Sequence, residues 1–428
     1  VLVLSPWGYY LEESLGLSLL FRMRGRVDPP PEVVIIGIDQ ASARQLKLSH
    51  KPRDWPRSLH TQLVRRLMEA KTKVIAFDII FDERRDAQQD EALAAAISAA
   101  GNVVLVEILR KEKLPFDDVA GQIEIEKLDQ PIDALRGAAL ALAPFPIPKV
   151  PVRVSQYWTF KTGAGSIPSF PVVVFQAYAL EVYQTLISLL RTEDGRLPVD
   201  IPTTTSELLQ RGRMESVVRD VREQIRAALS LNPGLRERFS TESDPGGGRP
   251  SELLQRLIDM YTAPASHYLN YYGPPGTIRT IPYHELVRND EGRHLIKALP
   301  ELAGKAVFIG LSEREIPVKT DGFYTVFSQP NGVDLNGVEI AATAFANILE
   351  DNPIRPMTTS NKIAMVGVCG VLLGMMCLLM SNAWAGFSMV VFGVVFLWIS
   401  RVYFTAGGLW MPVITMVFVQ APAAYILG

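Results

Sequence analysis

The hydrophobic pattern of this chain changes near its C-terminal end. The 66 residues from Ile363 to Gly428 contain a single formal charge, Arg401. Buried helices of water-soluble proteins usually keep a polar stripe. This segment has none, so we favour a membrane block over a pair of long buried helices. A bilayer-spanning helix needs about 20 mostly apolar residues, and the segment therefore predicts three transmembrane helices, at Ile363–Met380, Ala385–Ile399 and Leu409–Leu427.

A second apolar run stands at the other end of the chain. Val1–Leu4 leads into a cluster of tryptophan and tyrosine residues, and such residues gather at membrane interfaces. Leucines at every fourth position from Leu11 to Leu19 then predict a short amphipathic helix. We interpret residues 1–32 as the end of a preceding transmembrane helix plus a juxtamembrane helix; a frayed terminus is the alternative.

Between these ends, short β-branched runs alternate with helical periodicity. The runs have strand length and no polar interruption, as expected for strands buried on both faces. This alternation predicts an α/β domain over residues 33–350, with a mainly parallel sheet flanked by helices. The predicted strands are Val33–Ile38, Val74–Phe77, Val103–Val106 and Lys305–Gly310, and the predicted helices are Gln40–Leu46, Ser58–Ala70, Glu91–Ala100 and Gly337–Leu349.

Three features interrupt the simple alternation. Residues 191–264 are polar and contain two amphipathic patterns, which indicates a helical insertion. Val172–Leu190 is apolar enough for a further span, but its polar residues favour a buried helix. Tyr268–Tyr272 and Thr277–Ile281 flank Pro274-Pro275-Gly276, a sequence typical of a type II turn, and together they predict a β-hairpin.

Composition narrows the function. A net charge of −2 without a basic face argues against a nucleic-acid partner. Both cysteines, Cys369 and Cys377, lie in the first predicted span, so the rest of the chain has no disulfide or cysteine–metal site. We find no phosphate-binding or dinucleotide glycine motif, no HExxH and no nucleophile elbow. The sequence therefore predicts no catalytic residue, metal or cofactor, and it leaves open whether the protein is an enzyme.

Polar side chains follow the predicted strands. In open parallel sheets, ligands bind outside the carboxyl ends of the strands, so these side chains predict a ligand site for a cation, an amine or a polyhydroxy compound. For any single residue, helix capping or solvation is the favoured interpretation. A metal-assisted hydrolase using three of the aspartates stays open as an alternative. The candidate site residues are Asp39, Trp55, Arg57, Asp78, Asp82, Glu107, Ser312 and Glu313.

Seven motifs occur in order along the domain. They are Val33–Asp39, Trp55-Pro56-Arg57, Val74–Phe81, Gly101–Leu105, Tyr271–Gly276, Lys305–Gly310 and Asn336–Ala342. Together they resemble the second type of the cyclase- and histidine-kinase-associated sensory extracellular (CHASE) domain. The resemblance implies a bacterial receptor with one helix before the sensor, three after it and a cytoplasmic nucleotide cyclase or protein kinase beyond Gly428.

These implications define the expected partners and location. We expect a multi-pass protein of the bacterial inner membrane with its large domain outside the cytoplasm, contacting lipid and an unidentified ligand or protein. Because cyclases of this kind build active sites between two subunits, a homodimer is also expected. A structural or assembly subunit that has kept a sensor-like fold, and a membrane-anchored metal-dependent hydrolase, are the alternative functions.

Overall fold

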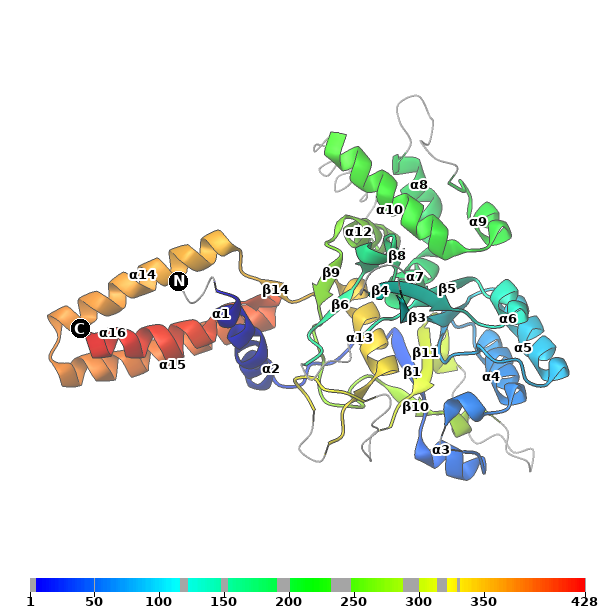
Figure 1. Ribbon diagram of the computed structural model, residues 1–428, viewed down its shortest axis with the longest axis horizontal. Coiled ribbons are helices and arrows are strands. Elements are labelled where there is room, and N and C mark those ends of the chain that lie inside the picture. The colour runs from blue at the N-terminus through cyan, green and yellow to red at the C-terminus, as the bar shows by residue number, and fades with distance from the viewer. Residues whose placement is uncertain are drawn as a thin grey trace.

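The computed structural model describes residues 5–49, 51–115, 122–147, 153–190, 201–231, 248–287, 300–313, 322–328 and 332–427. A large α/β domain stands at one end of the molecule, and a bundle of apolar helices extends from it (Figure 1). Val1–Leu4, which we interpreted as the end of a preceding span, lies outside the described residues, as do parts of the predicted insertion, at 191–200 and 232–247.

A seven-stranded sheet forms the centre of the large domain. Its order is β10-β1-β11-β2-β3-β4, with β5 also paired to β3, and every pair is parallel except β3–β4. The prediction of a mainly parallel sheet is confirmed. The strands are β1 (Val33–Ile38), β2 (Val74–Asp78), β3 (Val103–Pro115), β4 (Gln122–Asp129), β5 (Ala141–Pro144), β10 (Thr280–Pro282) and β11 (Ala306–Leu311).

Helices cover both faces of the sheet, which explains the continuous apolar runs. Alternate residues of β1 enter two different cores: Val33 and Ile35 one, Val34 and Ile36 the other. The helices on the Val33 face are α7 (Phe170–Tyr178), α8 (Tyr183–Leu190), α9 (Thr205–Arg211), α10 (Met214–Leu231), α12 (Arg249–Thr262) and α13 (Gly337–Glu350). Those associated with the Val34 face are α3 (Gln40–Gln45), α4 (Arg57–Glu69), α5 (Ala87–Ala100) and α6 (Asp133–Ala138).

One glycine sets the distance between the sheet and α13. A Cβ atom at Gly310, on β11, would lie 2.8 Å from Cβ of Val338 on α13. This separation is shorter than carbon atoms tolerate. The absence of a side chain at Gly310 therefore lets α13 pack directly on the central strand.

Two predictions about the middle of the chain have opposite outcomes. The apolar stretch Val172–Leu190 is buried in the domain: α7 is buried at every residue, and the chain bends by 64° before α8. The prediction of a hairpin is wrong. The turn exists, because Thr277 donates to the Pro274 carbonyl and Gly276 has φ +82°, but the residues after it join the sheet as β10, parallel to β1.

The small strand pairs connect loops rather than extend the sheet. They are β6 (Gln156–Trp158) with β9 (Ser266–Tyr268), β7 (Phe160–Lys161) with β8 (Ile167–Pro168), β12 (Gly322–Phe323) with β13 (Leu335–Asn336), and β14 (Arg355–Pro356) with β15 (Leu409–Trp410). Short 3₁₀ helices occur at Pro52–Asp54, Thr162–Ala164, Leu180–Val182, Tyr283–Glu285 and Pro300–Leu302.

Two helices of the apolar block are long enough to cross a bilayer: α14 (Thr359–Leu379) and α15 (Asn382–Gly407). The third predicted span, Leu409–Leu427, corresponds to β15 followed by a shorter apolar helix, Ile414–Ile426. That helix consists of the π-helical η8 (Ile414–Gln420) and α16 (Ala421–Leu427). At the N-terminus, α1 (Pro6–Leu11), η2 (Glu12–Gly16) and α2 (Leu17–Arg24) pack beside α15 and η8.

Candidate functional site

Two of the predicted strand-end carboxylates cap one short helix. Asp39 follows β1, and its Oδ1 accepts the Ser42 N–H at 2.6 Å. Glu313 follows β11, and its Oε2 accepts the Gln40 N–H at 2.9 Å. Both carboxylates therefore lie at the N-terminus of α3, where free N–H groups and the helix dipole favour negative charge. Capping, which the sequence offered as the alternative for Asp39, is what the structure contains.

The strand order separates Asp39 from Asp78. β11 lies between β1 and β2, and two strand spacings amount to about 10 Å. Asp78 is half-buried at the end of β2, beside Gly310 of the intervening strand. Ser312 follows β11 and is buried; its hydroxyl has no hydrogen-bond partner within the described residues.

Trp55 and Arg57 belong to the core below the sheet rather than to a crevice at the strand ends. Trp55 is fully buried, donates to the Ser49 carbonyl at 2.9 Å and stacks edge-on against Tyr283. Arg57 is 2 % exposed and its Nε lies 3.2 Å from Oδ1 of Asp90. Burial lowers the pKa of Arg57, and Asp90 opposes that shift. The arginine thus neutralises a carboxylate of α5.

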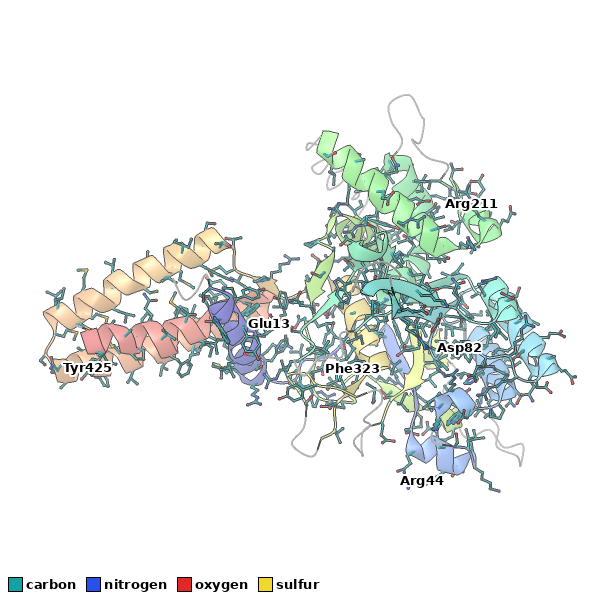
Figure 2. All side chains as sticks on the ribbon, in the orientation of Figure 1. Glu13, Arg44, Asp82, Arg211, Phe323 and Tyr425 are labelled. Atoms are coloured by element: carbon teal, nitrogen blue, oxygen red, sulfur yellow. The ribbon has the colours of Figure 1, made fainter. Side chains whose placement is uncertain are left out.

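Asp82 pairs with Arg53 at 3.0 Å on the side of the domain away from the membrane block (Figure 2). No group of three or more histidine, cysteine, aspartate or glutamate side chains suited to a metal ion occurs in the described ranges. The three aspartates of the hydrolase alternative therefore do not form such a group there.

Glu107 is the one predicted site residue that lines a large described cavity. The prediction that its strand ends there is wrong, because β3 continues to Pro115 and pairs with β4. The cavity, of about 810 Å³, lies between the sheet edge and α9–α10. Burial raises the pKa of Glu107 to about 7; the Gln130 amide, 3.2 Å away, opposes the shift and the nearby Glu215 carboxylate adds to it.

This shift predicts a pH-dependent stability. Because the pKa of Glu107 is higher in the folded protein than in the unfolded chain, the folded state binds more protons between about pH 4.5 and 7. Stability is therefore greatest at the acidic end and falls as pH rises, by up to about 3 kcal/mol. We expect Glu107→Gln to remove this slope in urea unfolding of the full chain in detergent at pH 5 and 8. An unchanged slope would assign it to other groups.

The described residues most directly placed to act on the membrane block form a third hydrophobic core. This core, which we call the junction core, includes Leu17 and Phe21 of the N-terminal helix, Tyr271 of the large domain, and Phe404 and Val413 of the apolar block. Phe21 makes edge-on contacts with both Tyr271 and Phe404, with ring centroids 6.1 and 5.0 Å apart. Packing is thus continuous from the domain into the membrane block.

The five residues Tyr268–Tyr272 connect this core to the end of α13. The Asn270 N–H donates to Oδ1 of Asn347 at 2.8 Å, and Nδ2 of Asn347 donates back to the Asn270 carbonyl at 3.1 Å. The Asn270 amide also donates to the Asn352 carbonyl at 2.8 Å. Arg24, at the end of α2, donates to Asn270 and to the Tyr271 carbonyl. One segment therefore holds α13, its continuation and α2.

An aromatic group surrounds the base of α14. The Trp410 ring lies 5.9 Å from Tyr9 and 5.3 Å from Tyr268, between centroids, and the two tyrosine hydroxyls hydrogen-bond to each other. The Lys362 ammonium lies 5.3 Å from the Tyr9 ring and 5.9 Å from the Trp410 ring. Cation–π attraction therefore fixes the start of α14 against both the N-terminal helix and the large domain.

Two carboxylates of the N-terminal helix complete the junction. Glu12 is buried and accepts the N–H groups of Ile414 and Thr415, at 3.2 and 2.6 Å, so it caps η8. Its neighbour Glu13 accepts the Ser155 hydroxyl of the large domain, and Figure 2 places it where the two parts meet. The N-terminal helix thus contacts both.

The sequence did not single out the junction residues as a site. Two of its signals point there: the run from Tyr268 to Gly276, dense in tyrosine and asparagine, and the Asn352-Pro353 pair before the apolar block. Neither has a local pattern typical of a binding site, because their partners lie more than 70 residues away in the chain.

Comparison with known proteins follows the same boundaries. The family model for the CHASE2 domain matches residues 2–379, which include the N-terminal helix, the whole α/β domain and α14. No curated protein and no solved structure matches the chain. The chain therefore belongs to the CHASE2 family of extracellular sensory domains of signalling receptors.

Proposed function

We propose that this chain is the sensory and transmembrane part of a bacterial receptor, located in the inner membrane with its large domain outside the cytoplasm. The junction core is the observation that supports this function. A sensor must pass a change in its own structure to the membrane helices, and bistable packed interfaces are the elements that do so. Leu17, Tyr271 and Phe404, from three distant parts of the chain, belong to one core.

We further propose that the receptor acts on a cytoplasmic nucleotide cyclase and works as a homodimer. The signal would leave the sheet through α13, bend at Asn352-Pro353 and enter α14, with Asn270 and Asn347 coupling that route to the N-terminal helix.

The test is cyclic-nucleotide production in membranes from cells that express the complete gene, with and without residues Val33–Glu350. We expect deletion of the domain to change the output. An output that is the same without the domain would contradict the receptor function. A membrane fraction without any cyclic-nucleotide synthesis would contradict the cyclase and leave the sensory role to be tested with another effector.

Topology supplies an independent prediction. We propose that the shorter helix Ile414–Ile426 crosses the membrane together with Trp410–Val413, as the third span. Its 13 apolar residues fall short of the length that a straight span needs, and the apolar residues before it supply the difference. Reporter fusions at Pro300 and Gly428 should then give opposite compartments. Fusions that report the same compartment would show an even number of crossings.

A further inference from the structure

A cavity of about 620 Å³ lies beside the junction core, where the end of α12, the β6–β9 pair and the end of α13 meet the segment leading to α14. Small-molecule sites have volumes of roughly 300–1,000 Å³. Its walls therefore come from both the sensory domain and the connection to the membrane, a position from which an occupant changes how the two are joined.

One side of the cavity holds more positive charge than its carboxylate neutralises. Asp351 ends α13 in the left-handed conformation, with φ +47°. Its carboxylate is shared by two arginines, Arg256 of α12 at 3.4 Å and Arg355 of β14 at 3.1 Å. Arg256 makes no second hydrogen bond or ion pair in the described part of the chain. Since a guanidinium has five N–H donors, both arginines keep donors for another anion.

The other side offers flat and apolar surface. The rings of Tyr157 and His267, cross-strand neighbours on β6 and β9, have centroids 6.3 Å apart. Burial lowers the pKa of His267 to about 4, so the imidazole is neutral at neutral pH and adds no charge. Met260 and Ile354, both buried, supply further apolar wall. A ring-sized apolar group fits this surface better than a strongly hydrated one.

We propose that this cavity binds a small organic anion in which a carboxylate is attached to an apolar ring. The carboxylate binds Arg256 and Arg355, whose planar donors match its two oxygens, and the ring lies against Tyr157 and His267. Binding weakens the hold of both arginines on Asp351, so the direct link between α12 and the segment after α13 becomes a link through the ligand. The signalling consequence rests on the receptor function proposed above, whereas binding does not.

Binding is tested with two probes of equal shape, 2-naphthoate and its uncharged amide 2-naphthamide. Titration calorimetry on the full chain in lipid nanodiscs should detect 2-naphthoate and not the amide. Arg256→Gln should weaken 2-naphthoate binding about tenfold or more, because a hydrogen bond to a charged group is lost. Arg249→Gln is the matched control: Arg249 starts the same helix and pairs with Glu32 at 3.5 Å, outside this cavity, so affinity should not change.

A second variant keeps the charges and fills the space. Thr262, a partly exposed residue of the cavity wall, replaced by tryptophan should abolish binding while the unfolding transition is retained. No heat of binding for 2-naphthoate at millimolar concentration, equal binding of the amide, or full affinity in Arg256→Gln would each overturn the proposal. Cyclic-nucleotide output is then measured with the probe: a probe that binds without changing the output contradicts the coupling and leaves the binding site established.

Discussion

Replacing Asp90 with alanine is expected to lower the free energy of unfolding of the sensory domain by about 3–5 kcal/mol, because it leaves the buried Arg57 without its carboxylate. The two side chains are 7 % and 3 % exposed, respectively. Asp90 also accepts the Arg85 N–H at 2.9 Å. The measurement is urea unfolding of the full chain in detergent, followed by the fluorescence change of buried Trp55, which lies in the same core.

The control is Asp86→Ala on the same helix. Asp86 caps α5, with its Oδ1 accepting the Gln89 N–H at 2.8 Å. Loss of an exposed cap costs about 1 kcal/mol. A double replacement, Arg57→Met with Asp90→Leu, should cost much less than Asp90→Ala, since it removes both charges together. Equal losses for Asp90→Ala and Asp86→Ala would show that the buried pair contributes nothing beyond capping.

The second large effect is expected at the helix that leaves the sheet. Phe345 of α13 is fully buried, with ring centroids 5.5 Å from Phe308 on β11 and 5.5 Å from Tyr178 on α7. Truncation of such a side chain costs about 3–5 kcal/mol through lost transfer energy and an unfilled cavity. Phe345→Ala should therefore destabilise the domain by that amount in the same unfolding experiment.

The matched control lies one turn further along α13. Ile348 is only partly buried against the same core, and Ile348→Val should cost about 0.5–1.5 kcal/mol. If the receptor function proposed above is right, Phe345→Ala should also reduce the change in output that an occupant produces, because α13 no longer moves with the sheet. A fully stable Phe345→Ala protein would show that α13 does not depend on this packing.

Local patterns identify most of the elements. The runs Val33–Ile38 and Val74–Phe77 are strands because an uninterrupted β-branched run suits a position covered on both faces. Gly276 after two prolines forms the expected turn, because only a residue tolerant of positive φ fits there. Likewise, the absence of charge after Ile363 identifies α14 and α15 as apolar helices without any reference to the rest of the chain.

The tertiary structure decides which elements become neighbours. β11 pairs between β1 and β2 although more than 220 residues separate it from either in sequence, and this insertion separates Asp39 from Asp78. Likewise, Thr280 pairs with Ile35 of β1 rather than with the strand before its own turn, so the expected hairpin is absent. Pairing between distant strands depends on side-chain contacts across the whole sheet, which a local pattern does not contain.

The junction follows the same rule. The sequence by itself determined that a sensor-type α/β domain is attached to apolar helices, since strand runs and charge-free segments are local properties. Only the fold brought Tyr268 against Trp410, Asn270 against Asn347, and Arg256 and Arg355 to one carboxylate. The physical reason is that each of these contacts joins residues from different elements, whose approach is fixed by how the helices pack on the sheet and on one another.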